Sequence, residues 1–530
     1  MPSYFIQYIF LILIILALVM IANRLRLAYP IVLVLGGLAL SFTGEFSNIT
    51  IDPQFVFFIF LPPLLYEAAW QVSWKEFWRW RRLITSFAFP IVIITACVIA
   101  FVSYALIPGF TLALGFLLGG IISPPDAISA TTIMRRVNVP KSLLSIVESE
   151  SLLNDASSLI VFRFAVAAVI TGQFYFQEAA LNFAIVIVMG IAVGLLVAFV
   201  FYAIHRWLPT TTSIEIVLTL VTPYCMYYVA EHFHFSGVLA VVTGGLFLSS
   251  RRQRLLNVRS RIQGVNVWTN LVFVLNGLIF LLIGLQLRSV TQQLGETSLA
   301  KAIEYGLIIS VVLIVSRLAC TLGASVFSTF MSRFITVADA HPGWRNPIIF
   351  GWSGMRGVVS LAAALSIPLL MSDGRPFPYR NLILFITFVV ILVTLVFQGL
   401  TLPWVIRKVK PEDKYAAIPE HEQELMIQKK IAGASLRFLE KEYGNERAHN
   451  EHLNNLFVRL QSELNSLDGA ENSLGKYHGV YLKLLERQRK MLEKMNHSAE
   501  FDEELIRKYM SLIDLEEFKI REKRVRDAEP

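Results

Sequence analysis

Three carboxylates and one side-chain amide stand together at the head of a long apolar stretch. The segment E-S-E-S-L-L-N-D contains Glu148, Glu150, Asn154 and Asp155, and a largely apolar run follows over residues 156–170. A carboxylate at the centre of a lipid bilayer costs roughly 3 kcal/mol on insertion scales. Ionisable side chains inside apolar spans pair with one another or mark pathways for ions and protons. These residues therefore predict a buried ion pair, a site that a polar species visits, or both.

A further acidic residue follows two prolines in another apolar run. Asp126 comes directly after Pro124 and Pro125, and proline interrupts a helix because it lacks a backbone donor. Unwound backbone there would offer carbonyl oxygens beside the carboxylate. Ser151 and Asp155 are four residues apart and so share one face of a helix. Hard cations prefer oxygen ligands, so we predict a sodium site at Asp155 and Asp126 with Ser151 as a further ligand. The alternative for Asp126 is the capping of a helix.

A carboxyl group at such a site holds either a proton or a cation, and never both. If the site opened alternately to the two sides of a membrane, this competition would couple two opposite fluxes. The scheme requires no cofactor, and we expect none.

Other charged residues in apolar runs have several readings. Glu150 and Arg317 are candidates for a buried ion pair, either structural or gating, because an unpaired buried arginine is very costly. Arg356 lies in a glycine-rich break, where it could neutralise the ends of broken helices or face a cavity. Glu67 follows F-L-P-P-L-L-Y and could lie on the ion pathway or act as an interfacial anchor. Arg163 could pair with Glu67 or extend to the membrane surface.

Enzymatic chemistry has little support in the sequence. Gly351-Trp352-Ser353-Gly354 resembles an intramembrane serine-protease motif, but such chemistry needs a histidine base, and the next histidine is His421 in the tail. No phosphate-binding glycine loop of the nucleotide hydrolases is present. The three cysteines form no motif. We therefore predict that the chain is not an enzyme.

Composition indicates that helices crossing a membrane position these residues. Of the 530 residues 55% are hydrophobic and 16% are charged, whereas soluble domains average about 25% charged residues. Apolar runs of the roughly 20 residues that a bilayer requires predict about thirteen transmembrane helices in an all-α polytopic membrane protein. Their limits are near 4–22, 29–43, 54–71, 83–107, 111–134, 143–170, 177–204, 213–231, 236–250, 266–287, 302–331, 347–371 and 382–406.

Basic residues are distributed unevenly between the loops. Alternate connections hold twenty Lys and Arg residues against four in the opposite set. The positive-inside rule then places the N-terminus outside and the C-terminus in the cytoplasm, in a multi-pass protein of the plasma (inner) membrane. The net charge of +8 is carried by the membrane part, so it does not indicate binding of nucleic acid. We divide the chain into a transmembrane domain, 1–410, and a cytoplasmic helical domain, 411–530, with two helical segments separated near 466–475.

Two apolar runs are interrupted at mid-depth. One contains Ser123-Pro124-Pro125-Asp126 and the other contains Gly351 to Gly357, where glycine weakens a helix. Each interruption falls in the fifth span of one half of the membrane domain. Paired broken spans of this kind are typical of secondary transporters built from inverted repeats.

Several motifs together resemble one family of transporters. They are F-L-P-P-L-L-Y-E-A-A at 60–69, I-S-P-P-D-A at 122–127, E-S-L-L-N-D-A at 150–156, S-R-L-A-C-T-L-G at 316–323 and G-M-R-G-V-V-S-L-A-A-A-L-S at 354–366. With these residues the chain resembles the monovalent cation:proton antiporter-1 family, in its bacterial NhaP-like form. The resemblance implies a homodimer with a dimerisation scaffold and a moving core that has crossed, unwound helices.

The resemblance also implies roles for individual residues. Asp155 would bind the cation and the proton, with Asn154, Asp126 and Ser151 completing the site. Glu150 would pair with Arg317, and Arg356 would stabilise the core. An Asn-Asp pair resembles the electroneutral branch, so we expect exchange of sodium or lithium for protons, one for one. The alternatives are a potassium/proton antiporter and, more remotely, a cation channel.

Overall fold

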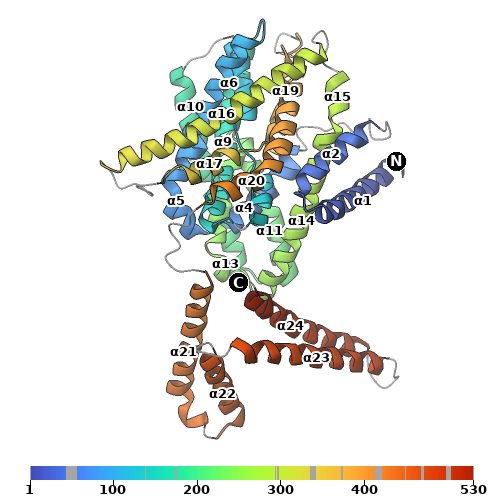
Figure 1. Cartoon of the computed structure of the whole chain (residues 1–530), viewed down its shortest axis with the longest axis vertical. Helices are drawn as coiled ribbons and strands as arrows, with labels where there is room; N and C mark the ends of the chain where they lie inside the picture. The colour runs from blue at the N-terminus through green and yellow to red at the C-terminus, as the bar shows by residue number, and fades with distance from the viewer. Residues whose placement is uncertain are drawn as a thin grey trace. The chain divides into compact units, whose positions relative to one another are not determined.

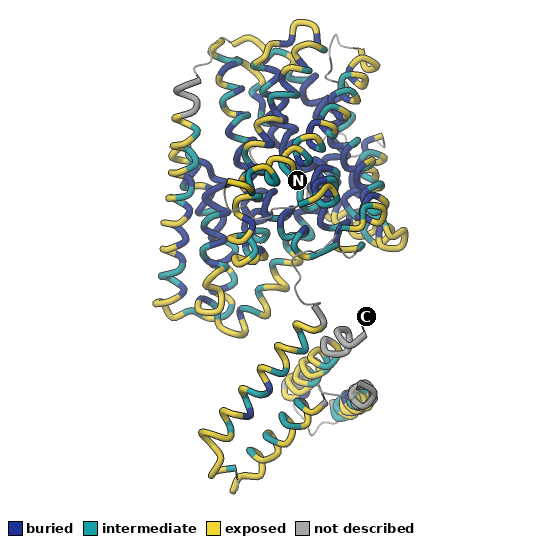
Figure 2. Tube along the Cα trace, turned by 60° about the vertical axis from the view of Figure 1, so that its left-hand side comes forward, coloured by how far each residue is buried: buried dark blue, intermediate teal, exposed yellow. Residues whose placement is uncertain are grey.

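The computed structural model separates into two compact units, Met1–Asp413 and Lys414–Pro530. It describes residues 2–42, 56–137, 139–172, 176–292, 294, 298–334, 342–371, 374–411, 420–447, 449–466, 471–496 and 503–528. Figure 2 shows that buried residues gather inside the first unit, whereas the helices of the second unit are mainly exposed.

The first unit is built from helices (Figure 1). In its first half they are α1 (Pro2–Arg24), α2 (Tyr29–Ser41), η1 (Val56–Phe60), α4 (Leu61–Gln71), α5 (Trp74–Ser86), η2 (Phe87–Ile91), α6 (Val92–Leu106), α7 (Leu112–Ile122), α8 (Ala127–Met134), η3 (Arg135–Val137) and α9 (Lys141–Thr171). In its second half they are α10 (Phe176–Trp207), α11 (Thr212–His232), α12 (Gly237–Ser249), α13 (Arg252–Leu255), α14 (Val258–Leu285), α15 (Leu287–Gln292), α16 (Leu299–Met331), α17 (Arg345–Trp352), α18 (Val358–Leu365), α19 (Arg380–Val393), η4 (Thr394–Gln398) and α20 (Gly399–Val409).

Helices lie within each of the apolar ranges predicted from the sequence. Residues 54 and 55, at the start of the predicted range 54–71, lie outside the described residues. Eight helical stretches of the described chain are long and apolar enough to cross a membrane, and shorter apolar helices accompany them. The first unit is therefore a multi-pass helical membrane protein.

Two of the predicted spans are broken where the sequence indicated. α7 ends at Ile122 and α8 begins at Ala127, so the proline pair lies between them. α17 ends at Trp352 and α18 begins at Val358, on either side of the glycine-rich segment. Figure 1 shows α17 beside α16, with which it packs. Each break leaves helix ends inside the unit, and their backbone groups need partners there.

Glycines allow α2 and α14 to approach closely. A Cβ atom at Gly37 would lie 2.2 Å from the backbone oxygen of Leu281, and one at Gly284 would lie 2.2 Å from that of Val34. Helices in membranes use such small residues to bring their backbones into contact. The α2–α14 contact is thus set by the absence of side chains at two positions.

The second unit contains four described helices instead of the two segments predicted. α21 (Glu420–Arg447) packs on α22 (Glu451–Ser466), and α23 (Glu471–Asn496) packs on α24 (Glu503–Ala528). The predicted division near 466–475 does separate the two pairs. The turn before α22 was missed, although the Asn450 side chain accepts hydrogen bonds from the backbone of His452 and Leu453 and so caps this helix.

Charged side chains join α23 to α24. Arg489 lies 2.5 Å from Asp514 and 2.7 Å from Glu517. Hydrogen bonds from Arg489 and Arg521 lower the pKa of Glu517. These contacts lie on the surface, so apolar packing between the helices contributes more to their association.

We predict that Gly284→Ala destabilises the protein by about 1–3 kcal/mol, the usual cost of overpacking a tight contact. The added methyl group meets backbone, which cannot move aside without separating α2 from α14. The measurement is the thermal unfolding midpoint in detergent. Gly264→Ala in the same helix is the control, because the nearest atom to its Cβ would be 4.0 Å away. Equal midpoints for the two variants would contradict the prediction.

Candidate ion-binding site

Asp155 lies midway along α9, and its residue surface is 7% exposed. Within the described part of the chain no hydrogen bond or ion pair reaches its carboxylate; only its backbone oxygen accepts one, from the Ser158 hydroxyl at 3.1 Å. Buried polar groups normally have partners, so an unpartnered buried carboxylate is unusual. Asp155 is therefore poised to take a ligand from outside the protein.

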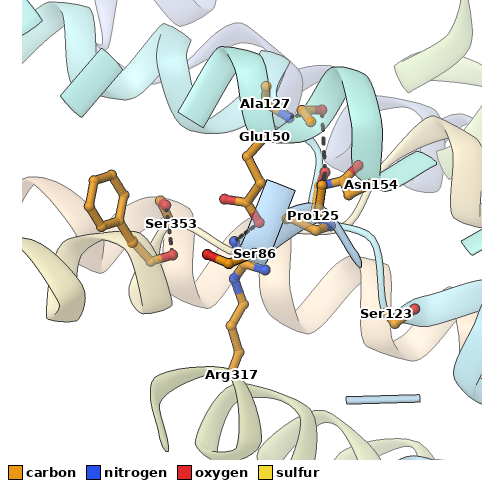
Figure 3. A network of polar contacts seen from close by, with 12 residues as sticks. Ser86, Ser123, Pro125, Ala127, Glu150, Asn154, Arg317 and Ser353 are labelled. Atoms are coloured by element: carbon orange, nitrogen blue, oxygen red, sulfur yellow. Dashed lines mark hydrogen bonds and ion pairs between the residues drawn. The ribbon is translucent and has the colours of Figure 1, made fainter. Parts of the chain in front are cut away.

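Ser151 and Asn154 join α9 to the break between α7 and α8. The Ser151 hydroxyl accepts from the backbone nitrogen of Ala127 at 3.2 Å and lies 3.4 Å from the Pro125 oxygen. The Asn154 amide nitrogen donates to the same Pro125 oxygen at 3.3 Å (Figure 3). These side chains satisfy backbone groups that the prolines leave without helical partners. They fix the break beside Asp155.

Asp126 caps the helix that follows the break. Its carboxylate accepts from the backbone nitrogens of Ile128 and Ser129 at 3.2 and 3.3 Å, and from the Ser129 hydroxyl at 2.6 Å. A Cβ atom at Gly357 would lie 2.6 Å from the same carboxylate, so Asp126 also lies against the N-terminal end of α18. The capping alternative for Asp126 is thus present in the structure. The charge of Asp126 also acts on Asp155.

Arg356 binds the C-terminal ends of the two broken helices, opposite to the N-terminal ends that Asp126 contacts. Its side chain is fully buried and donates to the backbone oxygens of Ile122 at 2.7 Å, Ser123 at 3.0 Å and Gly354. The first two lie at the C-terminal end of α7, and the third lies just beyond the end of α17. A helix C-terminus carries about half a negative charge, so one guanidinium compensates two such ends. Of the two readings left open for Arg356, neutralisation of helix ends fits this geometry.

The two breaks contact each other directly. The backbone nitrogen of Asp126 donates to the Met355 oxygen at 2.7 Å. Two side chains of η4 add further bonds: the Thr394 hydroxyl accepts from the Arg356 backbone nitrogen at 3.1 Å, and the Gln398 amide donates to the Trp352 oxygen at 3.1 Å. Neither Thr394 nor Gln398 was predicted from the sequence. Their only signal was that they are polar residues in an apolar span.

Glu150 and Arg317 form a buried ion pair. Arg317 Nη2 lies 2.7 Å from Glu150 Oε1, the two side chains are at most 3% exposed, and Figure 3 shows them pointing toward one another. Gly354 makes room for this arrangement, because a Cβ atom there would lie 2.4 Å from the Arg317 side chain. The negative charge of Glu150 is therefore balanced within the protein by Arg317.

Glu148 and Glu67 are only half-buried. Glu148 pairs with Arg135 at 2.7 Å, which accounts for its charge. Glu67 accepts a hydrogen bond from Gln71 and lies near enough to Glu148 and Arg135 for their charges to act on it. The position of Glu67 close to these charges is compatible with either of its predicted readings.

Arg163 pairs with Glu231 at 2.5 Å rather than with Glu67. Glu231 also accepts from the backbone nitrogen of Gly237 at 3.1 Å, so the pair links α9 to the α11–α12 connection. Sequence alone could not choose this partner, because the two residues are 68 positions apart and several acids were available.

The three acids Glu150, Asp126 and Asp155 have different surroundings. Arg317 neutralises the charge of Glu150, and Asp126 contacts the N-terminal ends of α8 and α18. Asp155 alone of these three has no described partner. An isolated, desolvated carboxylate beside hydroxyl and carbonyl oxygens can bind a hard cation or a proton.

Comparison with known proteins identifies the family. Residues 10–408 match the family described as sodium/hydrogen exchanger, transmembrane. The chain belongs to this family. Sodium/hydrogen exchangers are membrane transporters and not enzymes, so the membership confirms the predicted class, a sodium/proton antiporter.

Individual relatives in the exchanger family agree with this result. The chain is 30% identical over 530 residues to an uncharacterised sodium/proton exchanger of Mycobacterium tuberculosis, covering 94% of this chain and 93% of the relative. It is 32% identical to the sodium, potassium, lithium and rubidium/proton antiporter of Bacillus pumilus, covering 75% of this chain. That alignment spans only 60% of the length of the Bacillus protein.

A solved exchanger structure shares the fold. The sodium proton antiporter MjNhaP1 from Methanocaldococcus jannaschii superposes with a TM-score of 0.58 at 19% identity. The superposition covers 77% of this chain and all of that chain. The likeness supports an NhaP-like helical fold for the first unit.

We predict that Glu150→Gln destabilises the exchanger by about 3–5 kcal/mol, because it leaves Arg317 buried without a countercharge. Thermal unfolding in detergent, followed by size-exclusion chromatography, measures the effect. Glu148→Gln, in the same helix, is the matched control, because its partner Arg135 is exposed and such surface pairs contribute about 0–1 kcal/mol. A Glu150 variant as stable as the control would contradict the prediction.

Proposed function

We propose that Asp155 is the residue at which this antiporter binds its cation and its proton. The observation that supports the proposal most directly is the contrast among the three acids Glu150, Asp126 and Asp155. Glu150 has Arg317, Asp126 has the ends of two helices, and Asp155 has no described partner. A transported ion needs a carboxylate that is free to release and rebind it.

We assign Asp126, Ser151 and Asn154 supporting roles at this site. A carboxylate offers about four lone-pair positions, so Asp126 can cap α8 and still face a cation. The Ser151 hydroxyl and the carbonyls of the break supply neutral oxygen atoms. Asn154 holds the Pro125 carbonyl and adds no charge. Glu67 is proposed as a pathway residue.

The proposed cycle is alternating access. Asp155 releases its proton and takes up a cation on one side, and the exchange reverses on the other side. The proposal includes a homodimer in which a core moves against a scaffold, with about thirteen spans arranged as inverted repeats. We further propose that the N-terminus lies outside, that residues 1–410 form the membrane domain and that residues 411–530 form a helical domain in the cytoplasm.

Sodium and lithium are the proposed cations. Potassium/proton exchange is the second candidate, because the name of the Bacillus pumilus relative includes potassium and rubidium. Sodium and potassium both bind oxygen ligands, so the residue types at the site do not separate them.

We predict that Asp155→Asn reduces exchange to the level of protein-free vesicles, because the amide can neither release a proton nor balance a cation. The assay is cation-driven pH change in proteoliposomes, repeated with sodium, lithium and potassium. Glu148→Gln serves as the control for loss of a carboxylate on α9 and is expected to retain exchange. A well-folded Asp155 variant with near-normal exchange for any of the cations would refute the assignment.

The second prediction is electroneutral exchange. Asp155 with a proton and Asp155 with a monovalent cation have the same net charge, and Asn154 contributes none. The site therefore carries equal charge in both directions. Sodium is the test cation, and potassium with valinomycin clamps the membrane potential at several values. The initial exchange rate should be the same at each value. A rate that changes steeply with potential would exclude one-for-one exchange.

A further inference from the structure

Helix α5 is unlike the apolar helices around it. Its sequence W-K-E-F-W-R-W-R-R-L-I-T-S contains four cationic residues and one acid, and it leads directly into the apolar run of η2 and α6. Ser73 caps its start by accepting from the Glu76 backbone nitrogen at 3.5 Å. The helix thus stands at one end of a membrane span that extends to Leu106.

The helix has two faces with different surroundings. Trp80 and Ile84 are buried and pack toward the interior of the unit. Trp74 and Trp78 are 47% and 54% exposed, and Arg81 is exposed beside them. Spacings of four and three residues place Trp74, Trp78 and Arg81 on one face of the helix.

The exposed side chains are ordered against one another. The rings of Trp74 and Trp78 stack with centroids 5.9 Å apart, and the Arg81 guanidinium lies 4.5 Å over the Trp78 ring. Arg81 also donates to the Trp78 backbone oxygen at 2.6 Å. Glu76, the only acid of the helix, accepts from the Trp80 ring nitrogen at 3.0 Å and lies 3.9 Å from the Arg79 guanidinium, so its charge is paired within the helix.

We propose that the outer face of α5, formed by Trp74, Trp78, Arg81 and Arg82, binds the headgroups of anionic phospholipids. Tryptophan prefers the boundary between the bilayer and water, where its ring contacts chains and its N–H contacts polar groups. Clustered arginines next to a membrane span attract anionic lipid. The charge and the aromatic stack occupy the same face, which fits a lipid that presents a phosphate above an apolar tail.

Lipid bound at α5 would act on the helix that carries Asp155. α5 continues into η2, and the Ala88 oxygen of η2 accepts from the Ser157 hydroxyl at 2.5 Å. Ser157 lies two residues beyond Asp155 on α9. Anchoring of α5 by headgroups would therefore act on the position of α9 and, on the proposed role of Asp155, we expect the exchange rate to depend on the anionic lipid content.

The test uses the full-length protein in vesicles of phosphatidylcholine with a minor fraction of brominated lipid, either phosphatidylglycerol or phosphatidylcholine. Bromine quenches nearby tryptophan fluorescence. We expect stronger quenching by the brominated anionic lipid, and loss of this difference in Trp74→Phe/Trp78→Phe. In Arg81→Gln/Arg82→Gln the preference for anionic lipid should fall about fivefold per arginine removed.

Two further variants decide the interpretation. Arg81→Lys/Arg82→Lys keeps the charge and should retain most of the preference. Arg252→Gln/Arg254→Gln removes two exposed arginines from another segment and should leave the preference intact. Equal quenching by the two lipids, or an equal loss in the Arg252 and Arg254 control, would overturn the proposed site. Exchange that is independent of phosphatidylglycerol content would overturn the effect on α9 while leaving antiport itself untouched.

Discussion

The contact between the two broken helices is the interaction on which the other features of the site depend. Backbone groups inside a bilayer must find partners within the protein, and each break exposes two helix ends. Asp126 lies against the two N-terminal ends, and Arg356 donates to the carbonyls of the two C-terminal ends. One acid and one base thus compensate four helix ends, so unwound backbone can persist beside the ion site.

This compensation leaves Asp155 as the one of the three acids Asp126, Glu150 and Asp155 without a described partner. Arg317 pairs with Glu150, and part of the Asp126 carboxylate is used in capping α8, so an ion that binds at Asp155 as proposed leaves both arrangements in place. Ser151 and Asn154 connect the break to α9, so the backbone oxygens and the Asp155 carboxylate keep a fixed relation. On the proposed assignment, α9 carries a structural charge at Glu150 and the transported charge at Asp155, five residues further along the same helix.

Much of this arrangement could be predicted from the sequence, because proline, glycine and charged residues are energetically costly inside apolar helices and therefore stand out there. One proline pair and one group of glycines in apolar runs located the two breaks. The cost of a buried arginine indicated a partner for Arg317, Glu150 was a candidate, and the family resemblance implied the same pair. Other contacts gave no local signal. Thr394 and Gln398 bond to backbone across roughly 40 to 50 residues, and the choice of Glu231 by Arg163 depends on packing between helices. Too few helices were predicted for the second unit. The turn at Asn450 between α21 and α22 was missed because it interrupts the helical pattern of the sequence only briefly.

Gly354 and Gly357 limit how this exchanger can diverge. A side chain at Gly354 would meet Arg317, and one at Gly357 would meet the Asp126 carboxylate, so the centre of the contact accepts almost no substitution. Ser151 differs from these glycines, because its hydroxyl contacts the break through hydrogen bonds alone, so a different side chain there would alter polar groups beside Asp155 without displacing backbone. A tightly packed centre surrounded by replaceable polar side chains would let one helical framework change the groups around Asp155 by single substitutions.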